Sequence, residues 1–236
     1  MSFRPALAFL TSIGGARDPE PRMMAWFPIV GAAVGGAVGA SWWLADRIWP
    51  PAVAAAIAIS VDLAVTGLLH ADGLVDAADG LLPHLSRERR LAVMREPAVG
   101  AYGIAVCAAV LLLRFTALAA IRVDPLLLVA IWCASRTAMA VAAESVPYAR
   151  ADDGLATAML GGAWAPIAAY GVGAALAAGA VASGWSGVAA VTACVAAAAA
   201  VVALGRHQLG GYTGDVLGAA GLVGETVALL VAAAKW

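Results

Sequence analysis

The sequence has few charged residues. Only 12% of its 236 residues are Asp, Glu, Lys or Arg, about half of the ~25% that is usual in soluble domains. At the same time 63% of the residues are hydrophobic, and a chain of this length has too much surface to hide such a share from water. Disorder is excluded for the same reason, because disordered chains are poor in apolar residues. The composition therefore predicts an integral membrane protein.

A strong charge of one sign and paired cysteines are also lacking. The formal net charge is −1, so no overall electrostatic field points to nucleic acid as a partner. Cys107, Cys133 and Cys194 each stand alone in an apolar run. This spacing fits neither a metal centre nor a disulfide framework, and we interpret the three cysteines as small core residues.

Long apolar stretches fill most of the chain. A helix needs about 20 apolar residues to cross a bilayer, and one charge-free run is long enough for two such helices joined by a Ser- and Gly-rich turn at residues 183–187. The predicted spans are residues 25–45, 51–69, 98–121, 125–143 and 216–234, with two more inside 154–205. The expected fold is therefore all-α, a polytopic bundle of about seven spans (six to eight). We expect it to form a single integral membrane domain over residues 1–236.

Basic residues are distributed unevenly over the loops between these spans. If the N-terminus is placed inside the cell, the inside loops hold Arg4, Arg17, Arg22, Arg87, Arg89, Arg90, Arg95, Arg150 and Arg206. The outside loops then hold only Arg47, Arg122 and Lys235. Cytoplasmic loops carry such an excess of arginine and lysine. Because the inside loops are also the long polar ones, we expect the active site at the cytoplasmic face.

The densest polar segment follows the second predicted span and reads His-Ala-Asp-Gly-Leu-Val-Asp-Ala-Ala-Asp-Gly over residues 70–80. If the span continues as a helix through this segment, Asp72, Asp76 and Asp79 lie within about a 60° arc of one helix face. Three carboxylates on one face repel one another unless a cation shares them, and Mg²⁺ binds a few carboxylates together with substrate phosphates. A solvated acidic loop is the alternative, but ionisable groups beside a membrane span are costly and usually functional. The segment therefore predicts a Mg²⁺ site.

The same segment resembles a known signature. Its His-x-Asp-Gly-Leu-x-Asp-x-x-Asp-Gly pattern is similar to that of the cobalamin synthase family, the adenosylcobinamide-GDP ribazoletransferases. The similarity continues in order along the chain, at residues 86–95, 100–103, 135–136, 147–150 and 210–215. One segment departs from the pattern. Where the family commonly has Lys-Asp-Ser-Arg, this chain has Arg95-Glu96-Pro97-Ala98 and so lacks the hydroxyl and the second basic residue.

The resemblance implies an activity and its partners. The family transfers the adenosylcobinamide-phosphate moiety of adenosylcobinamide-GDP to α-ribazole, or to α-ribazole 5′-phosphate. GMP is released, adenosylcobalamin or its 5′-phosphate is formed, and the reaction depends on Mg²⁺. The implied location is the inner membrane of a prokaryotic cell, with the N-terminus and the catalytic loops in the cytoplasm. Membrane lipid is expected around the bundle, a homo-oligomer is left open, and nucleic acid is not expected.

The residues can be assigned roles in such a reaction. Phosphoryl transfer depends mainly on positioning and on neutralising the charge of phosphate oxygens. As implied by the resemblance, Asp72, Asp76 and Asp79 would hold Mg²⁺. One of the acids Asp79 and Asp76, or His70, would accept the proton of the attacking hydroxyl, and Asp79 is favoured as the outermost acid.

Arginines supply planar bidentate contacts to phosphate. The predicted substrate and phosphate contacts are Arg87, Arg90, Arg95, Arg136, Arg150, Thr213 and Asp215. Other interpretations stay open for several of them. Membrane topology alone requires basic inside loops, Arg136 is equally suited to a structural ion pair with Asp62, Glu144 or Glu225, and Asp215 is equally suited to cap the last helix.

Two other functions are weighed against this one. A phosphoalcohol transferase of the CDP-alcohol type carries Ala-Arg between its two Asp-Gly pairs and a closing Asp-x-x-x-Asp, whereas this chain has Ala77-Ala78 and lacks the closing pair. A small transporter often shows internal repeats and a binding site at the membrane midplane. The sequence shows no repeat, and its acids gather at the predicted inner surface. Both alternatives therefore rank below the ribazoletransferase.

Overall fold

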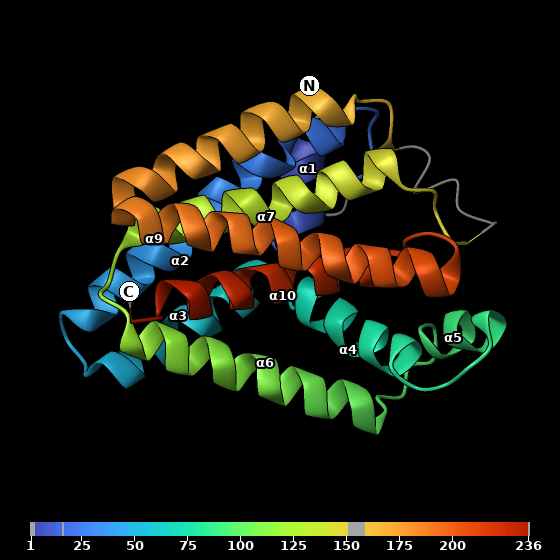
Figure 1. Ribbon diagram of the computed structural model, residues 1–236, viewed down its shortest axis with the longest axis horizontal. Helices are drawn as coiled ribbons and strands as arrows, with labels where there is room; N and C mark the ends of the chain where they lie inside the picture. Colours follow the sequence, from blue (N-terminus) through green and yellow to red (C-terminus); the bar gives the residue numbers. More distant parts are fainter. Residues whose placement is uncertain (1–2, 16, 151–158, 236) are drawn as a thin grey trace.

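The computed structural model describes residues 3–15, 17–150 and 159–235, and in this part of the chain helices dominate (Figure 1). The helices are α1 (Phe3–Leu10), the short 3-10 helix η1 (Met23–Trp26), α2 (Phe27–Asp46), α3 (Pro51–Val65), α4 (Leu69–Leu81), α5 (Arg87–Val93), α6 (Ala101–Ala120), α7 (Pro125–Ser145), α9 (Trp164–Leu209) and α10 (Gly214–Ala232). This confirms the prediction of an all-α protein.

Several helices are long and apolar enough to cross a bilayer. Five segments of the described chain pass this test, and they contain α2, α6, α7, α9 and α10. The count rises to six if α3 and α4, which pass together, form one broken span. The multi-pass membrane character is thereby confirmed, whereas the count of seven spans stays a prediction. Residues 154–158 of the predicted run 154–205 lie outside the described residues.

The long helix α9 folds back on itself. Its backbone leaves the helical region at Ser183 and at Gly184, which has a φ of 59°, and a positive φ is a conformation that glycine adopts readily. Gly179 and Gly187 then face each other so closely that a Cβ on Gly187 would lie 2.0 Å from the carbonyl oxygen of Gly179. The two arms run side by side in opposite directions (Figure 1), and the predicted turn at residues 183–187 is confirmed.

Small residues bring the helices into close contact. On α2, a Cβ added to Gly31 or Gly35 would lie 2.5 Å from the carbonyl oxygen of Trp132 or Leu128 on α7. Helix pairs in membranes pack in this way because apolar lipid gives them little hydrophobic driving force, so that close backbone approach and van der Waals contact hold them together.

The second predicted span does not continue as a helix through the acidic segment, so this expectation is wrong. The chain bends by 87° between α3 and α4. Two successive residues at the bend have left-handed backbones, Gly67 with φ 57° and Leu68 with φ 62°, and a helix cannot pass through such residues. The acids lie instead on the separate helix α4, whose 13 residues still place them at i, i+4 and i+7.

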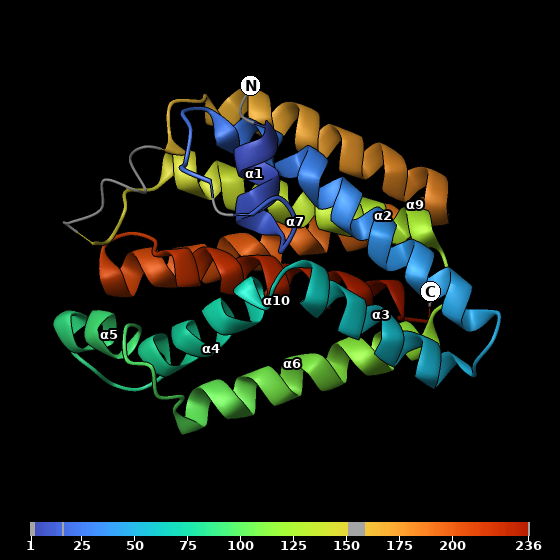
Figure 2. The same cartoon turned by 180° about the vertical axis from the view of Figure 1, so that it is seen from behind.

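The polar loops gather at one end of the bundle. The C-terminal ends of α4, α7 and α9 lie there with helix α5 and with the N-terminal end of α6 (Figures 1 and 2). Helix α10 begins further inside the bundle, where Asp215 lies against Gly73 of α4. The C-terminus and the turns that join α2 to α3 and α6 to α7 lie at the opposite end. This arrangement brings together loops that are far apart in the sequence, and it positions the site described next.

Candidate active site

The three predicted acids of α4 have different surroundings although they share one helix face. Asp72 is exposed and Asp76 is half-buried, and among the described residues neither side chain has a hydrogen-bond or ion-pair partner. Asp79 is buried, with 8% of its surface exposed. The three acids therefore divide into two free carboxylates and one that is enclosed by protein.

Asp79 is held by the beginning of the next membrane helix. Its two carboxylate oxygens accept hydrogen bonds from the backbone N–H groups of Gly100 and Gly103, at 2.7 and 2.9 Å. These groups belong to the first turn of α6, where N–H groups lack partners within the helix and a negative charge is stabilising. Asp79 thus fixes the start of α6 against α4, and this contact engages the oxygens that the sequence analysis assigned to Mg²⁺ and to proton transfer.

Asp215, at the start of α10, is a further carboxylate close to Asp72 and Asp76. Helices α4 and α10 approach closely at two glycines, and a Cβ on Gly73 would lie 3.0 Å from the carbonyl oxygen of Asp215 and 3.3 Å from the Cα of Gly218. The side chain of Thr213 caps α10 by accepting a hydrogen bond from the N–H of Val216 at 3.3 Å, and its hydroxyl donates to Asp215 at 3.2 Å. We call Asp72, Asp76 and Asp215 the acidic group.

The acidic group carries more negative charge than its neighbours balance. Asp76 lies within electrostatic range of Asp215, Asp72 and Asp79, and Arg150 is the cation that acts on it. Arg150 forms an ion pair with Asp215 at 3.1 Å. Carboxylates in such excess favour a bound cation with oxygen ligands.

The described residues do not contain a complete metal centre. Within the described ranges, no three His, Cys, Asp or Glu side chains lie close enough to hold a metal ion by themselves. The donor set still fits Mg²⁺, because this ion is usually bound by one or two carboxylates together with substrate phosphates. Asp72 and Asp215 meet this need, since both line the same cavity.

A cavity of about 210 Å³ lies between α4 and α10, next to the acidic group. Asp72 and Asp215 form its polar edge, His70 also lines it, and the rest of its wall is mainly apolar and aromatic. The main apolar lining residues are Phe9, Met24, Phe27, Met139, Tyr148, Met159 and Tyr212. The apolar part of the cavity can hold a flat apolar group, and its polar edge can hold a charged group.

The predicted arginines of the α5 region have structural contacts. Arg87 donates to the backbone oxygens of Leu209 and Ala149, at 2.7 and 2.8 Å, and so connects α5 to the end of α9 and to the loop after α7. Arg90 is buried and donates to the backbone oxygens of Gly80 and Leu81, both at 2.8 Å, which satisfies carbonyl groups at the end of α4.

Arg95 and the segment that departs from the family pattern lie at the surface. The side chain of Arg95 is exposed, and in the described part of the chain it has no hydrogen bond or ion pair. Glu96 forms an exposed ion pair with Arg89 at 2.8 Å. Exposed pairs of this kind contribute little to stability.

Arg150 is the predicted phosphate contact that lies at the acidic group. Its position is fixed by a short pairing of two extended segments, in which the N–H of Ala149 donates to Tyr212 at 2.8 Å and the N–H of Tyr212 donates to Pro147 at 3.0 Å. The Nε of Arg150 is buried and has no partner among the described residues. One donor of the guanidinium is therefore unused within the described part of the chain.

Tyr212, which takes part in this pairing, keeps a protonated hydroxyl at neutral pH. Burial and the nearby carboxylate of Glu144 raise the pKa of Tyr212 to about 12.

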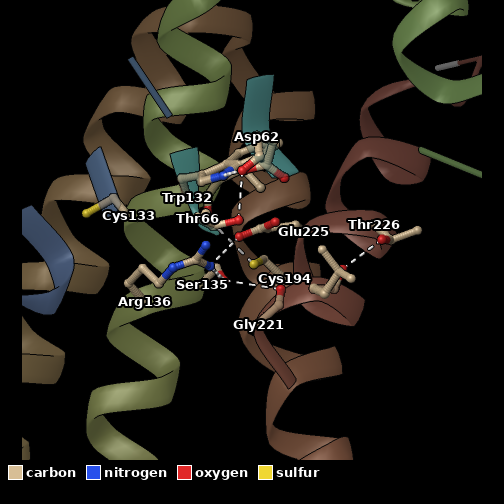
Figure 3. A network of polar contacts seen from close by, with 12 residues as sticks. Asp62, Thr66, Trp132, Cys133, Ser135, Arg136, Cys194, Gly221, Glu225 and Thr226 are labelled. Carbon is tan, nitrogen blue, oxygen red and sulfur yellow. Dashed lines mark hydrogen bonds and ion pairs between the residues drawn. The ribbon is translucent and has the colours of Figure 1, made fainter. Parts of the chain in front are cut away.

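Arg136 lies elsewhere, in a buried network of charges between the helices (Figure 3). It forms an ion pair with Glu225. Arg114 forms two further ion pairs, one with Glu225 at 3.0 Å and one with Asp62 at 2.7 Å. The indole N–H of Trp132 also donates to Asp62 at 2.9 Å. We call Asp62, Arg114, Arg136 and Glu225 the charge network. It corresponds to the structural interpretation of Arg136 that the sequence left open.

Sequence reasoning missed the part that Arg114 plays in this network. The signal was present, because Asp62, Arg114, Arg136 and Glu225 are single charges inside four different predicted spans. Isolated charges within membrane helices usually find one another in the interior of a bundle. Four such charges of balanced sign therefore predict a network, although not which pairs form.

Comparison with known proteins places the chain in a family. The model of the cobalamin-5-phosphate synthase family matches residues 2–233. The chain belongs to this family. Its relatives include an adenosylcobinamide-GDP ribazoletransferase of Deinococcus radiodurans, 42% identical over 121 residues, which cover 49% of this chain and 45% of that protein. The enzyme of the same name from Desulfitobacterium hafniense is 34% identical over 161 residues, 62% of each chain.

A third ribazoletransferase, from Ralstonia nicotianae, is 45% identical over 103 residues, 43% of this chain and 40% of that protein. The alignments with these three curated relatives thus span between 40 and 62% of the relatives' lengths. No solved structure matches the chain. In this member of the cobalamin-5-phosphate synthase family, segments that carry the resemblance converge on the cavity from α4, from the loop after α7 and from the start of α10.

Proposed function

We propose that the protein is an adenosylcobinamide-GDP ribazoletransferase of late cobalamin biosynthesis. The observation that carries the proposal is the acidic group, of which Asp72 and Asp215 lie at the edge of an aromatic cavity, with Arg150 paired to Asp215, in a chain of this family. Carboxylates for a divalent cation, a cation for phosphate and an apolar enclosure are what a transfer between a nucleotide diphosphate and a nucleoside requires.

In the proposed reaction, a hydroxyl oxygen of α-ribazole, or of its 5′-phosphate, forms a bond to the phosphorus atom attached to cobinamide. The bond from that phosphorus to the bridging oxygen of the diphosphate breaks, and GMP leaves with the electron pair. The hydroxyl proton passes to a carboxylate. We assign this role to Asp76, which has no hydrogen-bond partner among the described residues, and we assign to Asp79 the positioning of α6.

Asp72 and Asp215 would hold Mg²⁺, which supplies charge neutralisation on the diphosphate oxygens when it is bound. Arg150 would contact the same phosphates, because its Nε donor is unused among the described residues. Arg87 and Arg90 would act indirectly, since their contacts with backbone oxygens fix the loops around the site. These assignments keep the predicted acids and change the roles of Asp79 and Asp215.

We further propose that the polar end of the bundle faces the cytoplasm of a prokaryotic cell and that the spans lie in the inner membrane, surrounded by lipid. The excess of arginine in the loops at this end supports that orientation. Both substrates would then reach the site from the cytoplasm.

The test is a reconstitution. Purified protein in lipid nanodiscs is given adenosylcobinamide-GDP, α-ribazole or its 5′-phosphate, and Mg²⁺, and the formation of GMP and of cobalamin is followed by chromatography. We expect both products in equal amounts, no product after chelation of Mg²⁺, and recovery when Mg²⁺ is restored. Folded protein that forms neither product from either acceptor contradicts the proposal.

A further inference from the structure

The interior of the cavity is built from two aromatic pairs. Phe9 and Phe27 are stacked with their ring centroids 6.0 Å apart, and Tyr148 and Tyr212 meet edge to face at 5.2 Å. Three methionines complete the wall, Met24, Met139 and Met159. Methionine side chains adapt to irregular shapes and make favourable contacts with aromatic rings. Such a wall suits a flat, uncharged ring, whereas a phosphate would lose its hydration there without compensation.

His70 lines this cavity and carries a buried polar ring whose nitrogens are unsatisfied among the described residues. Its side chain is 2% exposed and lines the cavity, and neither ring nitrogen has a hydrogen-bond partner among the described residues. A buried polar group without a partner is energetically unfavourable, because it has lost its hydrogen bonds to water. Groups of this kind are rare in folded proteins and call for a missing partner. A ligand that accepts or donates one hydrogen bond inside the cavity would supply it.

Size and charge select which part of which substrate fits. The volume of about 210 Å³ is below the roughly 300–1,000 Å³ of pockets that enclose a whole drug-sized ligand, so it suits one or two fused rings. A corrin macrocycle is far larger than that. The guanine of the diphosphate substrate has many polar edge groups, whereas the wall of the cavity is mainly apolar and has His70, two acids and two tyrosines as its polar side chains.

We propose that the cavity binds the aromatic base of the acceptor nucleoside, with an N–H of His70 donating to the ring nitrogen that is not bonded to ribose. The ribose then lies at the polar edge, where its hydroxyls face the acidic group. This inference rests on the proposed function and assigns to the cavity the selection of the base. His70 becomes a specificity-determining residue, not the proton acceptor.

The experiment measures both Michaelis constants in nanodiscs. His70→Phe keeps a ring but removes the hydrogen bond, and we expect it to raise KM for α-ribazole about tenfold, the effect of one buried hydrogen bond. KM for adenosylcobinamide-GDP should stay within about twofold. His70→Gln, which keeps an N–H donor, should recover most of the affinity for α-ribazole. Met139→Ala should shift the preference among acceptor nucleosides towards those with larger bases, because it enlarges the cavity.

The matched control is His84→Phe, which changes an exposed histidine that does not line the cavity and should leave both constants unchanged. Thermal unfolding of each variant shows whether it is folded. If His70→Phe raises KM for adenosylcobinamide-GDP instead, or lowers kcat alone, the cavity does not hold the base and the inference fails while the proposed function stands. If the unmodified protein forms no product, the proposed function itself fails.

Discussion

Two groups of charged side chains in this protein differ in how far their positive and negative charges cancel. The charge network pairs two carboxylates, Asp62 and Glu225, with two arginines, and all four side chains are at most 5% exposed. The acidic group has three carboxylates, among the described residues Arg150 is the cation that acts on Asp76, and two of the acids, Asp72 and Asp215, line a cavity. Glu225 and Asp215 are ten residues apart on the same helix, about 15 Å along its axis.

The difference indicates which group has a structural task and which has a chemical one. A buried ion pair is tolerated in a bundle when every charge has a partner, and breaking it leaves an uncompensated charge. An unbalanced group costs stability in the free protein, and proteins keep such groups where a ligand supplies the missing charge. Removing one charge should therefore destabilise the network and spare or stabilise the acidic group.

The largest expected effect is on stability, from Arg114→Met. This change leaves the buried carboxylates of Asp62 and Glu225 with less positive charge to compensate them. We expect it to lower the free energy of unfolding by about 3–5 kcal/mol. The free energy of unfolding is measured by denaturant titration in mixed micelles. The control is Arg122→Met, which changes an exposed arginine just beyond the same helix. Equal stabilities of the two variants would show that the network does not hold the helices together.

The next effect is on catalysis, from Asp76→Asn. We expect transfer activity to fall by about 10²–10⁴-fold, the range that a positioned proton acceptor contributes to a reaction. The free energy of unfolding should stay equal or rise, because repulsion with Asp215 and Asp72 is relieved. Activity is measured as GMP release, and membrane insertion is checked by fractionation. Turnover at the unmodified rate would remove Asp76 from the chemistry.

Much of this arrangement could be predicted from the sequence. The apolar runs predicted the membrane helices and the turn inside α9, and the spacing of the three acids predicted one helix face. The bend before α4 could not be predicted with the same means, because a left-handed backbone at a leucine such as Leu68 is locally unfavourable and no sequence pattern indicates it. The sequence pattern therefore located the acids and misjudged the direction of the helix that carries them.

The sequence also did not predict which side chains on different helices contact one another. The spacing treated Asp79 as equivalent to Asp72 and Asp76, but α6 begins beside it, and the N–H groups of Gly100 and Gly103 engage its carboxylate. Asp215 is far away in the sequence and joins the acids because Gly73 and Gly218 let α10 approach α4. Such pairings depend on the rotation and depth of each helix, which a single sequence does not specify.

The smallest expected effect tests the separation of Asp79 from the acidic group. Asp79→Asn keeps the size of the side chain and one acceptor oxygen, but it removes the charge and one of two hydrogen bonds to the start of α6. We expect a loss of about 1–2 kcal/mol in the free energy of unfolding, as for other helix-capping residues. Activity should fall much less than in Asp76→Asn, and assays of the two variants under identical conditions check this. An activity loss as large as that of Asp76→Asn, with no change in stability, would return Asp79 to the catalytic acids and make the spacing of the sequence the better guide.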